Sequence, residues 1–126
     1  MLERLFGGDA FQAQTRALDA SALRHQAIAH NLANANTPRF KRQEVQFETE
    51  LSRALNATDK TGTGSVSSVQ PRLVTVGGTS GRADGNNVNL ELESAKLAEN
   101  AMRFEVLSQS VGGYFSGLKN VINGGR

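Results

Sequence analysis

A run of apolar residues spaced seven apart near the C-terminus constrains this chain more than any other feature. The repeat is unbroken over five positions: Leu90, Leu97, Phe104, Val111 and Leu118. If these are the a positions of a heptad repeat, the d positions are Glu93, Asn100, Leu107, Tyr114 and Val121. A repeat of this length predicts a long helix, here residues 88–123, that packs along a second helix. We assign the apolar seam positions and Asn100 to a subunit interface.

Other residues of this segment bear on how the helix begins, bends and packs. Asn89 can cap its N-terminus, and residues 124–126 follow it as a tail. Gly112-Gly113 predicts a weak point or bend, because glycine costs about 1 kcal/mol relative to alanine inside a helix. Asn100 is either a device that fixes the register or a tolerated polar residue. Apolar residues off the seam are typical of a helix surrounded by partners: Leu92, Ala95, Val106, Phe115 and Ile122.

The N-terminal part also has the pattern of a long helix, which follows a short lead, residues 1–8. Asp9 is a candidate N-cap, and Gln12 three residues later completes a capping-box pattern. The helix must stop before Pro38, because a residue preceding proline is pushed out of the α region. We therefore place the helix and its stop at residues 9–37. Its interface positions are Phe11, Leu18, Ile28 and Leu32.

The middle of the chain is poor in apolar residues and divides into two parts. Residues 38–55 read as a turn and a short helix whose apolar face includes Phe47 and Leu51, with a short strand at Val45–Phe47 as the alternative. Residues 56–87 read as a glycine-rich connector that is mobile in the monomer. Within it, two short strands, Val66–Val69 and Leu73–Val76, can form a β-hairpin around Pro71.

The composition explains why the helices need each other and further partners. Only 38% of the 126 residues are apolar and 6% are aromatic, which is little for a self-sufficient globule of one domain. The sequence therefore predicts a mainly α fold, in which two long terminal helices pack as a coiled-coil-like pair joined by the connector. The surplus apolar helix surface indicates that the core is shared with neighbouring subunits.

No residue set in the sequence supports catalysis, a metal or a cofactor. The chain has no cysteine, and His25 and His30 are five apart, so they miss the i, i+4 spacing of a helical metal site. The net charge of +2 and the small basic cluster of residues 39–42 do not indicate nucleic-acid binding. No apolar run approaches the roughly 18 residues of a membrane span, and the first residues lack the apolar stretch of a signal peptide. We therefore predict a protein that is not an enzyme.

The N-terminal helix stops in the run Asn31-Leu32-Ala33-Asn34-Ala35-Asn36-Thr37-Pro38. This run resembles a signature of bacterial flagellar rod, hook and hook-associated proteins. That signature is a helix ending in Asn-(Leu/Ile)-Ala-Asn-x-x-Thr-Pro, usually followed by Gly-Tyr. The motif at the stop comprises Asn31, Leu32, Ala33, Asn34, Asn36, Thr37 and Pro38, with Asn36 at a variable position. Arg39 and Phe40 depart from the usual Gly-Tyr. The chain length and the runs at residues 84–91 and 120–125 are similar to the short proximal members of the rod family.

The resemblance implies a structural role in the flagellar basal body. Such proteins are exported unfolded through the flagellar type III apparatus without a cleaved signal, and they assemble in the periplasm as a helical tube, the rod, that transmits torque from motor to hook. The implied partners are copies of the chain, other rod proteins (FlgC and FlgF-like), the adapter FliE, and the base formed by the export gate and MS-ring. The alternative function is a helical secretion chaperone or adapter of the flagellar export system.

Overall fold

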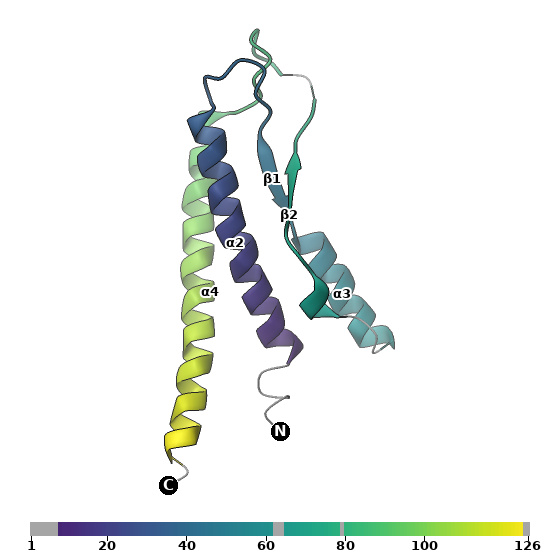
Figure 1. Ribbon diagram of the computed structural model, residues 1–126, viewed down its shortest axis with the longest axis vertical. Coiled ribbons are helices and arrows are strands. Elements are labelled where there is room, and N and C mark those ends of the chain that lie inside the picture. The colour runs from purple at the N-terminus through teal and green to yellow at the C-terminus, as the bar shows by residue number, and fades with distance from the viewer. Residues whose placement is uncertain (1–7, 62–64, 79, 125–126) are drawn as a thin grey trace.

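Two long helices from the two ends of the chain run side by side in opposite directions and form the body of the molecule (Figure 1). The computed structural model describes residues 8–61, 65–78 and 80–124. Helix α2 spans Asp9–Ala33 and helix α4 spans Leu90–Gly124. At 1.5 Å per residue they are about 37 Å and 52 Å long, so α4 extends well past the start of α2. The predicted mainly α fold with packed terminal helices is confirmed.

The N-terminus of α2 corrects the predicted capping box. Gly8 is the N-cap, no side-chain cap bond is formed, and the amide of Gln12 donates to the Gly8 carbonyl at 3.1 Å. Asp9 is instead the first helical residue, where its carboxylate still faces the positive end of the helix dipole. Gly8 replaces Asp9 as the cap because glycine tolerates this position nearly as well as a side-chain acceptor does. Most of the predicted lead, residues 1–8, lies outside the described residues.

Helix α4 begins at its predicted cap and is not broken at its glycine pair. The Asn89 Oδ1 accepts a hydrogen bond from the amide of Leu92 at 3.0 Å, which confirms the cap. The helix then continues without interruption through Gly112 and Gly113, and the predicted weak point stays a prediction. A Cβ added at either glycine would meet no other atom within 4 Å, and nothing in the described chain pushes the helix off its axis there.

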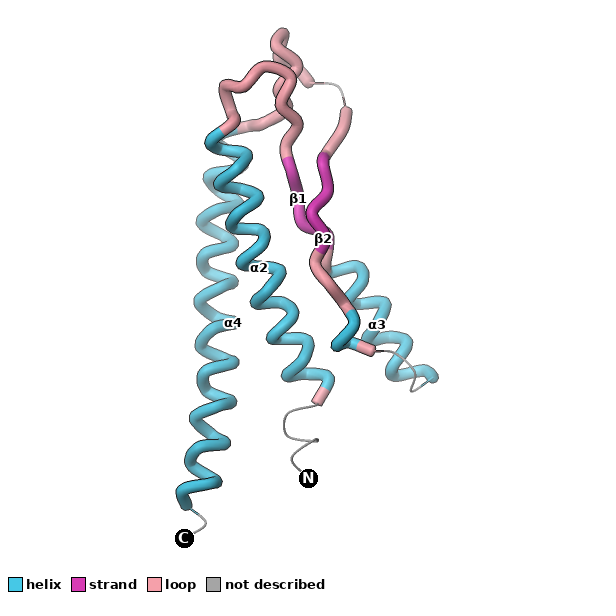
Figure 2. The backbone as a smooth tube through the Cα atoms, viewed as in Figure 1, coloured by secondary structure: helices cyan, strands magenta, loops and turns pink. Residues whose placement is uncertain are grey.

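The chain segment that connects α2 to α4 forms a short arm beside the helix pair (Figure 2). It consists of strand β1 (Gln43–Gln46), helix α3 (Glu48–Thr61), the 3-10 helix η1 (Val66–Ser68) and strand β2 (Arg72–Thr75). The strands pair antiparallel, with Gln43 opposite Thr75 and Gln46 opposite Arg72. Both alternatives for residues 45–55 are therefore partly confirmed. A strand ends at Gln46, and a helix starts at Glu48 and continues past residue 55.

The predicted strand at Val66–Val69 is wrong, and so is the hairpin built on it. Residues 66–68 form η1, and β2 pairs with β1 instead of with a neighbour inside the connector. The reason is the spacing of Val66 and Val69, which are both buried. A tight 3-10 turn brings residues i and i+3 to the same side, whereas a strand would point them to opposite faces.

The apolar core is small and lies where the arm packs on α2. Its buried members come from α2, the arm and the loop after η1: Ala20, Ala27, Val45, Phe47 and Val69. The Arg16 Nη2 also donates to the Ser67 carbonyl at 2.7 Å and ties η1 to α2. Helix α4 adds no member to this core, so its contact with α2 depends on other interactions.

Candidate functional site

The interface between α2 and α4 is pinned near its middle by a buried polar pair. The Ser21 Oγ donates to the Asn100 Oδ1 at 3.0 Å, and the Asn100 Nδ2 donates to the Ser21 carbonyl at 2.9 Å. Both side chains are buried. A shift of one helix along the other would leave these groups unpaired, at a cost of about 1–3 kcal/mol for each buried group. Of the two readings of Asn100, this geometry favours the register device.

An aromatic cluster closes the interface at the N-terminal end of α2. The rings of Phe11 and Tyr114 stack with their centroids 4.5 Å apart, and the ring of Phe115 meets Phe11 edge-on at 5.7 Å. Between this cluster and the polar pair, the Ser110 Oγ donates to the Gln14 Oε1 at 3.2 Å. Phe11 and Tyr114, which the heptad reading places on the seam, therefore meet each other.

The structure divides the predicted seam into a covered part and an uncovered part. Seam residues that α2 and α4 bury or half-bury are Phe11, Leu18, Ile28, Leu32, Leu97, Asn100, Leu107, Val111, Tyr114 and Leu118. Leu90, Phe104 and Val121 remain 52%, 41% and 72% exposed. A single helix covers only one side of α4, and α2 begins too late to reach the last turns, so part of the stripe faces outward.

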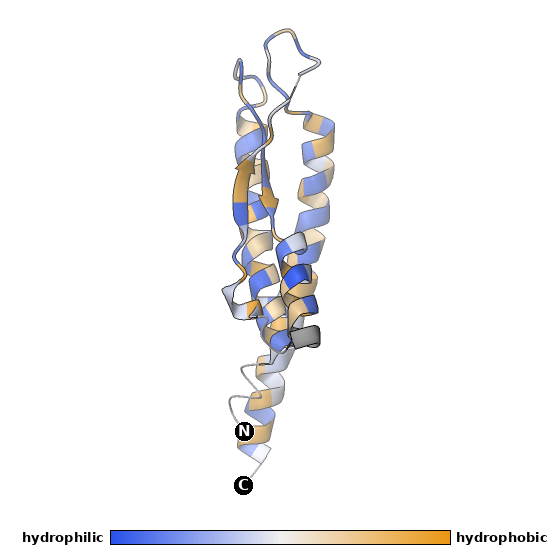
Figure 3. Cartoon of the chain, turned by 90° about the vertical axis from the view of Figure 1, so that its right-hand side faces the viewer, coloured by the Kyte–Doolittle hydropathy of each residue, from blue (hydrophilic) through white to orange (hydrophobic). Residues whose placement is uncertain are grey.

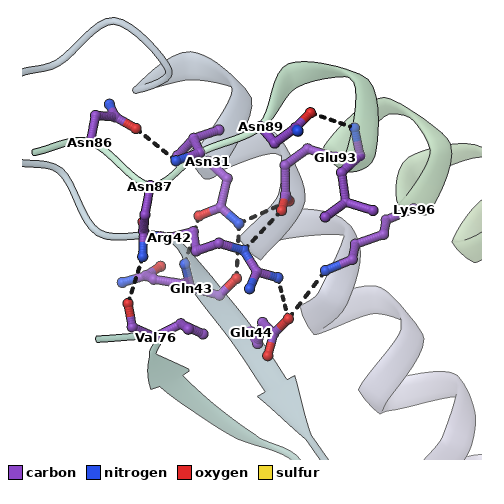
Figure 4. A network of polar contacts seen from close by, with 12 residues as sticks. Asn31, Arg42, Gln43, Glu44, Val76, Asn86, Asn87, Asn89, Glu93 and Lys96 are labelled. Carbon is purple, nitrogen blue, oxygen red and sulfur yellow. Dashed lines mark hydrogen bonds and ion pairs between the residues drawn. The ribbon is translucent and has the colours of Figure 1, made fainter. Parts of the chain in front are cut away.

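We call the end of the helix pair where α2 stops and α4 starts the turn end. A buried amide and a buried carboxylate hold it together (Figure 4). The Asn31 Nδ2 donates to the Glu93 Oε2 at 3.0 Å and to the Gln43 carbonyl at 2.8 Å. The Asn31 Oδ1 accepts from the amide of Gln43 at 2.7 Å. Asn31 and Glu93 are only 0% and 1% exposed. One asparagine thus joins α2, β1 and α4 and satisfies the first backbone groups of β1.

Charged side chains extend this network across β1. The Arg42 Nε donates to the Glu93 Oε1 at 3.1 Å, and the Arg42 guanidinium also binds Glu44. The Lys96 Nζ donates to the Glu44 Oε1 at 3.1 Å. We call the set Asn31, Arg42, Glu44, Glu93 and Lys96 the polar clasp. Its buried carboxylate is paired on both oxygens, as a buried charge requires.

The clasp shifts the pKa values of two of its members. Burial by itself would raise the pKa of Glu44, but hydrogen bonds from Arg42 and Lys96 and their positive charges outweigh it, so the pKa lies below its ordinary value. Burial would lower the pKa of Arg42, yet its bonds to Glu44 and Glu93 raise it above the ordinary value. Both shifts favour the charged forms, which hold the clasp together.

Two adjacent asparagines just before α4 bind other parts of the turn end: Asn86 holds the stop of α2, and Asn87 joins the residues that flank β1 and β2. The Asn86 Nδ2 donates to the carbonyls of Asn34, Ala35 and Thr37 at 2.9, 3.1 and 2.8 Å. The Asn87 Oδ1 accepts from the amide of Arg42 at 2.7 Å, and its Nδ2 donates to the Val76 carbonyl at 2.8 Å. These contacts were not predicted from the sequence, where residues 84–91 stood out for their similarity to short members of the rod family. The available signals were two adjacent amides and the carbonyls of a helix stop that need donors, and the sequence does not place them together because 51 residues separate Asn86 from Ala35.

The motif at the helix stop forms the turn that these amides hold. The Asn34 Nδ2 donates to the His30 carbonyl at 2.9 Å, and the Thr37 Oγ1 donates to the Asn34 Oδ1 at 3.2 Å. Leu32 and Asn34 are half-buried, while Ala33, Asn36, Thr37 and Pro38 are exposed. Arg39 adopts φ 61°, in the left-handed region, where the resembling signature has glycine. This position explains why glycine is usual there.

The described residues offer structural chemistry and no catalytic arrangement. A cavity of about 270 Å³ opens between α2, β1 and α4, but half of its charged lining residues are bound within the clasp and the others form the Arg24–Glu48 and Arg103–Glu99 pairs. No group of His, Asp or Glu within residues 8–61, 65–78 and 80–124 is placed to hold a metal ion. None of the described helices is long and apolar enough to cross a membrane.

Comparisons with known proteins agree with this arrangement. The family described as "Flagella basal body rod protein" matches residues 11–41, which cover most of α2, its stop and the turn. The flagellar basal body rod protein FlgB of Bacillus subtilis is 30% identical over 97% of this chain and 98% of its own length. The chain belongs to the flagellar basal body rod protein family. The FlgB proteins of Salmonella typhimurium (27% identical over 99% of both chains) and Borrelia hermsii (32% identical over 85% of this chain and 90% of that protein) are similar too.

Membership of the rod family fits the position of the matched residues. The matched segment contributes Asn31 to the clasp and contains the whole motif at the stop of α2. The family is one of structural rod components of the flagellar basal body and not one of enzymes. The features to explain in this chain are therefore contacts between helices and between subunits.

Proposed function

We propose that this protein is a structural subunit of the proximal flagellar rod, which assembles with itself and with other rod proteins into a helical tube that transmits torque from motor to hook. One observation carries the proposal. Of the large apolar side chains that are exposed among the described residues, all but Leu73 lie on α4: Leu90, Leu92, Met102, Phe104, Val106, Phe115, Val121 and Ile122. Exposed apolar surface on this scale marks an interaction site.

The distribution of these residues along α4 suits an assembly better than a pairwise contact. In Figure 3, apolar residues recur along α4 down to its C-terminal end, below the start of α2. Burial of apolar surface contributes about 25 cal/mol per Å², so each such side chain adds to association when a neighbour covers it. Contacts that repeat between unlike surfaces without closing a ring build a helical polymer.

Torque transmission requires that the two helices of each subunit do not slide. The Ser21–Asn100 pair and the clasp resist sliding, because each couples a fixed residue of α2 to a fixed residue of α4. In the proposal, the other partners of the subunit are rod proteins of the FlgC and FlgF type, the adapter FliE and the export-gate and MS-ring base. Export to the periplasm occurs without a cleaved signal, as the resemblance implies.

The substitution Phe104→Asp tests this proposal directly. Phe104 is part-exposed and outside the apolar core, so the aspartate is expected to leave the fold and export intact but to place a charge in the subunit contact. In cells whose own copy of the gene is replaced, we expect loss of swimming and loss of the chain from purified basal bodies, with normal export. Gln26→Asp, at an exposed position of α2, is the matched control. Normal motility of the Phe104 variant would contradict the proposal.

A further inference from the structure

Helix α4 presents apolar side chains on two sides that α2 separates. The first side, which we call the outer face, consists of Leu90, Phe104, Phe115 and Ile122. On an ideal helix with 3.6 residues per turn, these four side chains fall within an arc of about 40°. Met102 and Val106 point roughly 140–180° away from Phe115. The residues that contact α2, among them Asn100 and Tyr114, lie between these two directions.

The second side of α4 belongs to an apolar groove. The groove has a volume of about 500 Å³ and lies between α2, α4 and the start of α3. Its apolar lining comes from all three helices and the residue before α3: Ala17, Ala20, Phe47, Leu51, Met102, Val106 and Leu107. Met102 and Val106 are 65% and 67% exposed, so the α4 wall of the groove is open to a partner.

The charges beside the groove are already paired within the chain. The Arg24 Nη2 binds the Glu48 Oε1 at 2.6 Å, and the Arg103 Nη2 binds the Glu99 Oε1 at 2.7 Å. These residues are the charged part of the lining, and they leave no unmatched charge that would select an ionic ligand. A charged neighbour of the outer face is Lys119, about 40° from Phe115 on the same projection, and its long side chain can keep the ammonium in water. An apolar helix surface can therefore enter the groove without leaving a buried charge unpaired.

We propose that the outer face of α4 in one copy of this chain docks into the groove between α2, α3 and α4 of the next copy. This inference rests on the proposed rod function and adds the two surfaces that meet. The outer face and the groove point roughly 140–180° apart around α4, so a single two-fold contact cannot cover both and would leave one apolar surface in water. A head-to-tail contact covers both surfaces in every subunit except the first and last of the assembly. Each new subunit presents the same free surface as the one before, so further copies can be added.

A photo-crosslinking experiment tests which surfaces meet. Phe115 is replaced by the photoreactive analogue p-benzoylphenylalanine, which keeps the ring, and Phe104 is replaced in a second variant. Each labelled chain is co-produced with unlabelled chain so that rods are built, and basal bodies are irradiated and the joined peptides mapped by mass spectrometry. The expected partner peptides come from a second copy and contain residues 47–51 or 102–107. A label at Gln26, exposed on α2 away from both surfaces, is expected to give no such peptide.

Each other outcome decides against the inference. Peptides that join two outer faces would show a two-fold contact, and peptides from a different rod protein alone would show that another subunit covers this face. Absence of any joined peptide from both labelled positions, in basal bodies that contain the chain, would also overturn it. These results leave the rod function intact. If the unlabelled chain is itself absent from basal bodies, the proposed function fails first.

Discussion

The two ends of the helix pair are held by different chemistry. At the turn end, Asn31 and Glu93 are buried and fully bonded, and the carbonyls at the stop of α2 are bound by Asn86. At the far end, an aromatic cluster around Phe11 joins the two helices, and α4 continues past it with Val121 and Ile122 exposed. The contrast teaches that the turn end is completed within the chain, whereas the far end leaves apolar side chains of α4 exposed in the single chain.

The largest effect is expected from removing the amide that joins three elements of the turn end. Asn31→Ala leaves the amide and carbonyl of Gln43 and one oxygen of Glu93 without their partner. Each buried group that loses its bond costs about 1–3 kcal/mol, so we expect a loss of about 3 kcal/mol in the free energy of unfolding. Urea unfolding followed by far-UV circular dichroism measures it. Gln26→Ala, at an exposed site of the same helix, should change stability by less than about 0.5 kcal/mol.

Hydrogen exchange on the same variants sharpens the comparison between the ends. Asn31→Ala should speed amide exchange in residues 93–100 of α4, because the clasp no longer ties that part to α2 and β1. Exchange in residues 115–124 should be fast in both proteins, because few internal contacts protect them. Equal protection of the two segments in the parent chain would break the comparison.

The next effect concerns the buried Ser21–Asn100 pair, which lies between the two ends and fixes the register of α2 and α4. Ser21→Ala, Asn100→Ala and the double variant form a cycle that isolates the interaction of the two side chains. Because both are buried and bonded to each other, we expect a coupling of about 1 kcal/mol, within the range found for contacting polar residues. Additive single effects would mean that the pair is not what fixes the register.

An effect of similar size but opposite sign is expected at the left-handed turn residue. Arg39→Gly should stabilise the turn end by about 1 kcal/mol, since a left-handed backbone costs a residue with a Cβ about 1–2 kcal/mol. Arg39→Ala is the matched control, because alanine removes the charge but keeps the Cβ and should give no such gain. Thermal unfolding of the three proteins separates these effects. Equal gains from Gly and Ala would assign the effect to charge.

Local patterns predicted the elements of this fold better than their partners. The heptad run from Leu90 to Leu118 and the stop before Pro38 predicted two long helices, because both signals lie within a few residues of what they determine. The bonds of Glu93 to Asn31 and Arg42 could not be predicted, since those residues are distant in the sequence. A heptad pattern also does not say which side of a helix a single partner covers. Phe104 and Val121 were assigned to the seam, yet they remain exposed in the single chain.

The smallest effect on stability is expected from lowering the pH, which protonates Glu44, the more exposed carboxylate of the clasp. The pKa of Glu44 is lower in the folded chain than its ordinary value, so the unfolded chain binds more protons as the pH falls. The contribution of Glu44 is therefore complete above its ordinary pKa and disappears as the pH falls through the lowered one. Because the side chain is 43% exposed, solvent screens the pair and the contribution is less than about 1 kcal/mol.

The comparison of Glu44→Gln with the parent chain isolates this contribution. Urea unfolding at neutral pH and at successively lower pH should show a difference between the two proteins that shrinks as the pH falls. The bonds of Glu44 lie at the turn end, and the exposed apolar residues of the far end do not titrate. Hydrogen exchange in residues 115–124 should therefore not distinguish the two proteins at any pH. A difference that grows in acid would reverse the sign of the linkage and would remove Glu44 from the groups that stabilise the turn end.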